Sequence, residues 1–220
     1  MGNYPTFKSM KKIFKILIFT DLDGSLLHRD TFKFDEIKDY LKQLLSKGIF
    51  IIPNTSKTEK EILEFNNELG SNLPYISENG AAIKGLDILD TNLPKELILS
   101  REKDNLIKVF EKSVPLNLQN KCKWLYEMDK KKQSLIFGLE GEKLRLALDR
   151  KYTIPFIFAG NKIEKNELSK IVKNKGLAIQ EGGRVINLTD KINKAKALQV
   201  FVRFFKKNNK NVKTIAVGDN

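Results

Sequence analysis

Residues 13–25 read IFKILIFTDLDGS, an apolar run that ends abruptly in two aspartates and a glycine. The run is rich in β-branched and aromatic residues, which is typical of a buried strand. Asp21 and Asp23 stand on alternate residues, and Gly24 permits a sharp turn directly after them. This stretch therefore predicts a strand that delivers two carboxylates to the polar loop at its carboxyl end.

Helices and strands alternate after this first strand. Apolar residues recur at helical spacing over 35–47 and 59–69, and short strands are expected at 49–52 and 74–77. Such an order indicates a parallel sheet covered by helices, with right-handed crossovers between its strands. We therefore expect an α/β fold with a Rossmann-like parallel core sheet.

The rhythm is less regular between residues 84 and 184, which we interpret as an inserted α+β cap domain. Helices are expected there at 101–112, 141–149 and 164–174, and strands at 133–138, 154–158 and 177–180. The core pattern returns with a strand at 185–188, a helix at 193–205 and a strand at 212–217. The predicted domains are thus a core at 13–83 and 185–220 around a cap at 84–184. Because an α/β domain rarely ends on the loop after a strand, we expect the C-terminus to be truncated.

Composition argues against several classes of protein. The formal net charge is +13, but the lysines are scattered and no basic stripe is interleaved with aromatics, so no nucleic-acid partner is expected. No apolar run is long enough to span a membrane. One cysteine cannot form an internal disulfide and one histidine cannot build a His-based zinc site, which favours a reducing, cytoplasmic setting. A catalytic metal is then expected to be of the Mg²⁺ type, held by oxygen ligands.

Three polar loops follow apolar strands, and they begin at Asp21, Asn54 and Gly218. Loops at the carboxyl ends of neighbouring parallel strands converge on one crevice, where ligands of open α/β sheets bind. We therefore expect the three loops to share one site.

The residues of these loops predict phosphoryl transfer. Asp21 is the predicted nucleophile, and Asp23 the acid that protonates a leaving alkoxide and later activates water. Mg²⁺ between Asp21 and Asp219 would mask the repulsion between the carboxylates and polarise a phosphoryl oxygen. Thr55 and Lys194 would hold the phosphoryl oxygens during transfer.

Each of these residues also has an ordinary structural interpretation. Thr55 and Ser56 suit an N-cap of the following helix as well as they suit a functional role. A lysine such as Lys194, taken alone, is most often solvated. Asn79, Arg184 and Asp219 are residue types common in turns and on surfaces. An EF-hand calcium loop is excluded, because Gly24 falls at the fourth position rather than the sixth. What favours catalysis is that four weak signals occur in order, three of them directly after strands.

These motifs together resemble the signature of the haloacid-dehalogenase superfamily, which matches Asp21 to Ser25, Thr55, Lys194 and Gly218-Asp219. Glu78-Asn79-Gly80-Ala81 and the helix start at Lys194 are similar to its branch with a large cap inserted between the second and third motifs (Cof-like, type IIB). The resemblance implies a Mg²⁺-dependent phosphatase that passes through an aspartyl-phosphate.

Within this superfamily, further stretches resemble the mannosyl-3-phosphoglycerate phosphatases, namely 55–58, 77–83, 182–184, 190–191 and Lys194. This resemblance implies that a sugar phosphoglycerate, mannosyl-3-phosphoglycerate, is hydrolysed to mannosylglycerate and phosphate. It further implies that Mg²⁺ binds Asp21, the backbone carbonyl of Asp23, and Asp219, and that substrate contacts come from Ser56, Lys57, Asn79 and Arg184. The chain departs from the family pattern in two places: Thr153-Ile154-Pro155 stands for Ser-Glu-Pro, and the sequence ends at Asn220 before a further Asn-Asp pair.

Other functions stay open at this point. Another sugar-phosphate phosphatase or a phosphomutase would share Asp21 and Asp23, and a truncated homologue could be inactive. A basic binding module is the alternative from a different class. The sequence carries no signal for an oligomeric state.

Overall fold

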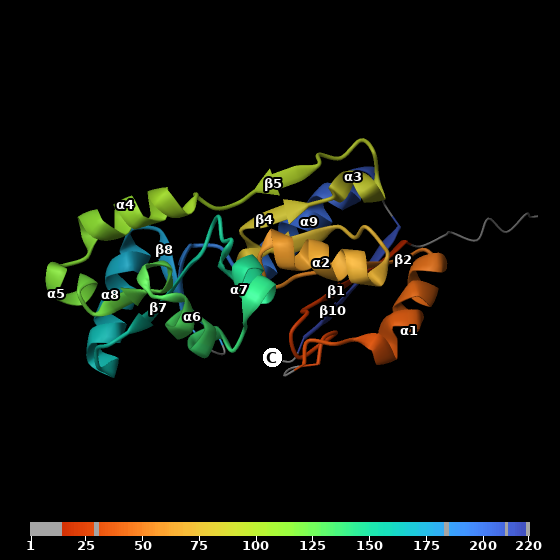
Figure 1. Ribbon diagram of the computed structural model, residues 1–220. Helices are drawn as coiled ribbons and strands as arrows, with labels where there is room; N and C mark the ends of the chain where they lie inside the picture. Colours follow the sequence, from red (N-terminus) through yellow and green to blue (C-terminus); the bar gives the residue numbers. More distant parts are fainter. Residues whose placement is uncertain (1–14, 29–30, 183–184, 210, 219–220) are drawn as a thin grey trace, which may run out of the picture.

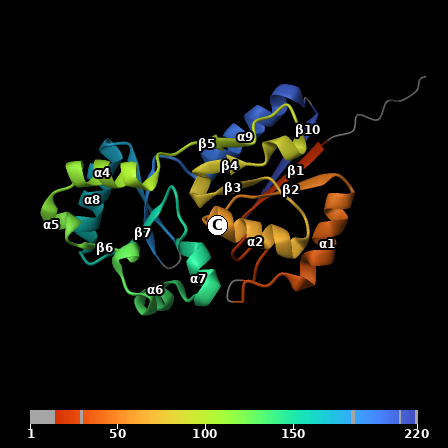
Figure 2. The same cartoon turned by 45° about the horizontal axis from the view of Figure 1, so that its top comes forward.

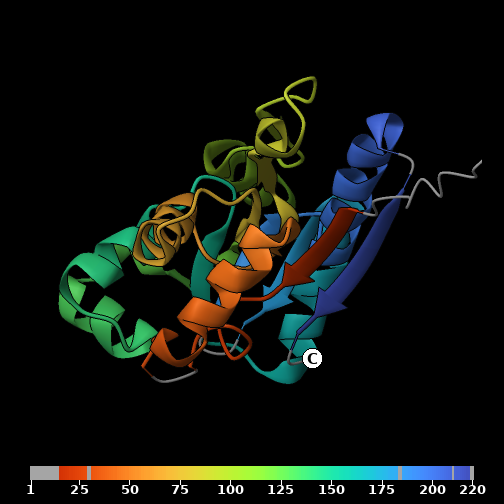
Figure 3. The same cartoon turned by 90° about the vertical axis from the view of Figure 1, so that its right-hand side faces the viewer.

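The core of the molecule is a three-stranded parallel sheet. The computed structural model describes residues 15–28, 31–182, 185–209 and 211–218. The central strand β1 (Lys15–Thr20) pairs in parallel with β2 (Ile49–Pro53) on one side and with β10 (Val212–Val217) on the other. β1 and β10 lie side by side in Figure 3, although they come from opposite ends of the chain.

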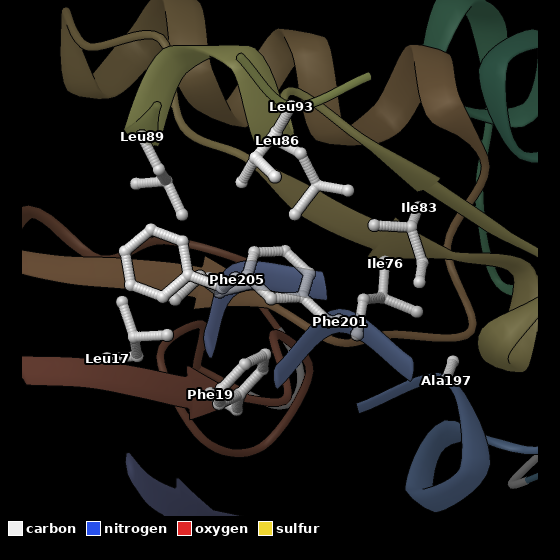
Figure 4. Close-up of a cluster of buried hydrophobic side chains, with 11 residues drawn as sticks. Leu17, Phe19, Ile76, Ile83, Leu86, Leu89, Leu93, Ala197, Phe201 and Phe205 are labelled. Carbon is white, nitrogen blue, oxygen red and sulfur yellow. The ribbon is translucent and has the colours of Figure 1, made fainter. Parts of the chain in front are cut away.

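Helices cover both faces of this sheet. They are α1 (Asp35–Ser46), α2 (Glu59–Leu69) and α9 (Lys194–Asn208). On one face Phe201 of α9 lies edge-on to Phe19 of β1, with ring centroids 5.1 Å apart, inside the cluster shown in Figure 4. On the other face, residues of α1 and α2 pack around Ile51. Ile51 and Ile52 belong to opposite clusters, because successive side chains of a strand point to opposite faces.

A small antiparallel sheet extends the core beyond β2. It contains β3 (Tyr75–Ser77), β4 (Ala82–Lys84) and β5 (Glu96–Ile98), with the short helix α3 (Leu86–Leu89) between the last two. Ile83, Leu86 and Leu89 are buried in the same cluster as Phe201 and Phe205. Residues 75–99 therefore pack with the core sheet.

The inserted segment forms a second layered unit with its own core. Its sheet is antiparallel in the order β6-β7-β9-β8, made of β6 (Cys122–Trp124), β7 (Ile154–Phe158), β9 (Ile186–Asp190) and β8 (Leu177–Glu181). Its helices are α4 (Lys103–Ser113), α5 (Leu116–Gln119), α6 (Lys130–Phe137), α7 (Gly141–Leu148) and α8 (Lys162–Asn174). Phe110, Phe156 and Leu168 are buried together in this unit. Figures 1 and 2 show this cap on the left of the core, with α7 nearest to the core helix α2.

The structure confirms the predicted α/β fold, with a parallel core sheet and separate antiparallel sheets. Helix 59–69 and strands 154–158 and 212–217 have the predicted bounds. The predicted strand at 133–138 is wrong: this stretch belongs to α6, which Asp129 caps by accepting a hydrogen bond from Lys132 N (2.9 Å). Within the described parts of the chain, no helix has the length and apolarity needed to cross a membrane.

Near the predicted cap limits, residues 84 and 184, the strands pair with other sheets than those limits imply. β4 continues to Lys84 and is followed by α3 and β5, which pack with the core. β9 was expected to open the second core segment, but it pairs with β7 and β8 of the cap. The chain therefore passes between the two sheets at about 99–102 and 190–193.

Candidate active site

A cavity of about 380 Å³ lies between the carboxyl ends of the core strands and the cap. The core lines it with Asp21, Asp23, Ser56, Lys57, Asn79 and Lys194. The cap lines it with Phe137, Leu139, Ala147, Arg150, Gln180, Gly182, Val185 and Asn187, among others. The cavity lies within the size range of small-molecule sites, and six of the predicted site residues meet in it.

Asp21 follows β1 directly, and both of its carboxylate oxygens have partners. Leu22 N donates to Oδ1 (2.8 Å), and Lys194 Nζ donates to Oδ2. Lys194 is the first residue of α9, so its position depends on where that helix begins. Asn193 N-caps α9, and Asn54 Nδ2 donates to Lys194 O (3.2 Å). The loops after two core strands and the start of α9 are thus joined around Asp21.

The turn Glu78–Gly80 lies tightly against the start of α9. Gly80 has φ +99°, and a Cβ atom at this position would lie 2.5 Å from Asn193 O. Glu78 and Asn79 also have positive φ values of 45° and 61°, which is unusual for residues other than glycine. Asn79 N donates to Thr55 O (3.0 Å), so the turn also joins the loop after β2.

Thr55 is fully buried and lies outside the cavity lining. Its backbone N–H donates to Ile76 O (3.0 Å), and its Oγ1 accepts from Lys57 N (3.3 Å). Neither Thr55 nor Ser56 caps α2, because Thr58 does so in a capping box with Glu61. An N-cap role of Thr55 or Ser56 is therefore excluded.

Asp23 lies beside Lys57, and Lys57 also pairs with Glu61. The Nζ atom of Lys57 is 3.0 Å from Asp23 Oδ1 and 3.2 Å from Glu61 Oε1. Burial raises the pKa of Asp23 above its ordinary value, and the attraction of Lys57 offsets this rise only in part. Burial alone would lower the pKa of Lys57, but the carboxylates of Glu61 and Asp23 outweigh burial and raise it. A carboxyl group that retains its proton longer than usual suits the acid predicted at Asp23.

Comparison with protein families decides the assignment. Residues 18–220 match the model of the haloacid dehalogenase-like hydrolases. The chain belongs to this family. The resemblance predicted from Asp21 to Ser25, Thr55, Lys194 and Gly218-Asp219 is thereby confirmed, and with it the prediction of an enzyme of the hydrolase and phosphatase class.

Named relatives of this haloacid dehalogenase-like hydrolase act on phosphorylated glycerate derivatives. A glucosyl-3-phosphoglycerate/mannosyl-3-phosphoglycerate phosphatase of Persephonella marina is 32% identical over 214 residues, covering 93% of this chain and 78% of the relative. A mannosyl-3-phosphoglycerate phosphatase of Pyrococcus horikoshii is 27% identical, with coverages of 92% and 83%. A haloalkanoate-superfamily phosphatase from Bacteroides thetaiotaomicron is similar in fold, with a TM-score of 0.63, 18% identity and coverages of 100% and 81%.

Membership of the haloacid dehalogenase-like family implies a divalent metal, typically Mg²⁺. The oxygen atoms that the described residues offer at the site suit this ion. Carboxylate oxygens of Asp21 and the backbone carbonyl of Asp23 are hard ligands of the kind Mg²⁺ prefers. A second cavity of about 230 Å³ is lined by Asp21, Asn54 and Gly218, so the end of β10 lies beside the first carboxylate. Among the residues with described positions, no three His, Cys, Asp or Glu side chains gather as a metal site. Two of the predicted residues, Arg184 and Asp219, lie outside the described residues.

Three residues at or beside this hydrolase site were given no role from the sequence: Glu61, Glu78 and Arg150. Glu61 pairs with Lys57, Arg150 lines the main cavity, and buried Glu78 joins the core to the cap. The pattern Thr58-x-x-Glu61 is a capping-box signal that could have identified Glu61. No sequence pattern marks Arg150, because its partner Ser56 is 94 residues away.

Proposed function

We propose that this hydrolase cleaves the phosphomonoester of mannosyl- or glucosyl-3-phosphoglycerate, releasing phosphate and a glycosylglycerate. The main evidence is that Asp21 lies at the end of the central strand and contacts Lys194. Asp23 lines the same cavity. The activities for which the relatives are named support the choice of substrate.

The proposed reaction has two steps. A carboxylate oxygen of Asp21 attacks phosphorus, the P–O bond to the glycerate oxygen breaks, and Asp23 gives its proton to that leaving oxygen. Asp23 then takes a proton from a water molecule, which attacks phosphorus and releases phosphate and free Asp21. Lys194 offsets the negative charge on the transferring group throughout.

Asp21, the backbone carbonyl of Asp23, and Asp219 are proposed to hold Mg²⁺, which would polarise a phosphoryl oxygen when bound. Ser56, Lys57, Asn79 and Arg184 are the proposed substrate contacts. The first three line the cavity, and Lys57 is paired with Asp23 and Glu61 there.

The test is phosphate release from a panel of phosphorylated sugars and glycerates, with Mg²⁺ and with EDTA. We expect mannosyl- or glucosyl-3-phosphoglycerate to give the highest kcat/KM, and EDTA to abolish turnover. Asp21→Asn should lower kcat by roughly 10³-fold or more, whereas Asp104→Asn, at an exposed position of α4, should leave it unchanged. Preference for a sugar phosphate without a carboxylate would favour another phosphatase of the family, and transfer of phosphate within a sugar would favour a phosphomutase.

A further inference from the structure

The cavity has three cationic side chains among the described residues, and they differ in their partners. Lys57 pairs with two carboxylates and Lys194 contacts a third. Arg150 makes hydrogen bonds only to neutral oxygens, and among the described residues no carboxylate lies within ion-pair distance of it. Its positive charge is therefore not neutralised by a direct partner in the described structure.

Arg150 has donors to spare. Its Nε donates to Ala147 O (3.1 Å), and its Nη1 donates to Ser56 O (3.1 Å) and to Thr153 Oγ1 (3.0 Å). A guanidinium has five N–H groups. Both N–H groups of Nη2 are left without an acceptor among the described residues, on a side chain that lines the cavity.

Buried Glu78 fixes the segment that carries Arg150. Its carboxylate accepts from Lys151 N (2.9 Å), Tyr152 N (3.0 Å) and Thr153 Oγ1 (2.7 Å), so Thr153 joins Arg150 to Glu78. Glu78 is only 2% exposed and has φ +45°. An unfavourable backbone conformation persists where surrounding contacts hold it, and Glu78 is held by the three cap hydrogen bonds to its carboxylate and by its own N–H, which donates to Lys57 O (2.9 Å).

We propose that Arg150 binds the carboxylate of the substrate, and that Thr153 and Glu78 are positioning residues that fix its guanidinium. The inference rests on the proposed function, because it assigns the carboxylate of a phosphoglycerate to this cation. Asp21, where the phosphate would react, and Arg150 lie on the core and cap walls of one cavity, so one molecule with two anionic groups could contact both. A single guanidinium with two unused N–H groups suits a carboxylate, which carries one charge on two oxygens.

A matched pair of ligands isolates this contact. 3-Phosphoglycerate and glycerol 3-phosphate differ in having a carboxylate or a hydroxymethyl group, and calorimetry measures their binding in the presence of Mg²⁺. All proteins carry Asp21→Asn, so that neither ligand is hydrolysed. With Arg150 present we expect 3-phosphoglycerate to bind about 10- to 100-fold more tightly, as charged hydrogen bonds typically allow.

Arg150→Met should remove this preference and leave the affinity for glycerol 3-phosphate within about twofold. Arg145→Met is the matched control, since Arg145 is exposed on α7 and pairs with Glu142 outside the cavity. Thr153→Val, which lacks the hydroxyl group, should weaken the preference, and Thr153→Ser should retain it. A role of Thr153 in folding alone would lower the affinity for both ligands equally.

A preference that survives Arg150→Met, or no preference with Arg150 present, would overturn the inference. If the preference depends on Arg150 but the wild-type chain hydrolyses no glycosyl-phosphoglycerate, the proposed function fails and the assignment of Arg150 stands. If the wild-type chain hydrolyses glycosyl-phosphoglycerates but the Arg150→Met variant binds both ligands as tightly as the Asp21→Asn protein, only the assignment of Arg150 fails.

Discussion

Lys194 is what distinguishes Asp21 from an ordinary loop aspartate. A fixed ammonium group against the carboxylate offsets negative charge when a phosphoryl group arrives. Lys194→Met should lower kcat by about 10²-fold or more and change the free energy of unfolding little, because the side chain is partly exposed. Steady-state kinetics check this, with Lys196→Met on the exposed side of the same helix as the control. Equal losses in the two variants would contradict the role of Lys194.

Cys122 is a buried residue on β6 with no part in the site. Burial raises the pKa of its thiol to about 12, so almost no thiolate forms at pH 8. Iodoacetamide should therefore not modify the native protein within the time that modifies the urea-unfolded chain completely. Mass spectrometry after a timed reaction measures this, and rapid modification of the native protein would show that β6 is open to solvent.

The turn Glu78–Gly80 packs against the start of α9, and a substitution at Gly80 tests this contact. Gly80→Ala should lower the free energy of unfolding by at least about 1 kcal/mol, because of its positive φ and the contact with Asn193 O. It should also lower kcat, since Asn193 begins the helix that carries Lys194.

Gly70→Ala is the matched control for this prediction. Gly70 also has a positive φ of 73°, but a Cβ atom there would meet nothing within 4 Å. It should lose stability through the backbone conformation alone and keep its kcat. Denaturant unfolding and steady-state kinetics separate the two effects, and an unchanged kcat in Gly80→Ala would show that the turn does not position Lys194.

Core elements were predictable from sequence because local signals agreed with their environment. The strand before Asp21 is apolar and central, and the helix at 59–69 has both its periodicity and a capping residue. The helix α6 was missed because Leu135, Ile136 and Phe137 look like a short strand. Only Phe137 of these three is buried, and the Asp129 cap and Gly138 at φ 63° are what define the helix.

Over the whole molecule, the two chain crossings between core and cap are joined by one ion pair. Arg101 precedes α4, Asp190 ends β9, and their side chains make hydrogen bonds of 2.8 Å at both carboxylate oxygens. Burial alone would raise the pKa of Asp190, but the hydrogen bonds from Arg101 outweigh it and hold the pKa below its ordinary value of 3.8.

This pair should make the stability of the protein sensitive to acid. Because the folded pKa is depressed, the contribution is complete above the unfolded value of 3.8 and is lost as pH falls through the folded value. Arg101→Gln should lower the free energy of unfolding by about 1–3 kcal/mol at pH 7, and the difference from wild type should shrink below pH 4. Urea unfolding at several pH values measures it, and a difference independent of pH would rule out this ion pair as the cause.

At the site, the sequence could not predict contacts between residues that are far apart along the chain. Residues that follow strands, such as Asp21 and Ser56, could be assigned to one edge because parallel strands fix where their loops meet. Arg150 and Glu78 are 72 positions apart by their numbers, and they meet through Thr153 only after the cap has packed on the core. No local pattern encodes such a contact.

The claim that Asp21 is the nucleophile is tested most directly by trapping the phosphorylated protein. Substrate labelled with ³²P is mixed with the protein and Mg²⁺, the reaction is quenched in acid within milliseconds, and the labelled peptide is sequenced. We predict label on the peptide that contains Asp21, and none in Asp21→Asn. Phosphate release without label at Asp21, or turnover that survives Asp21→Asn, would contradict the account.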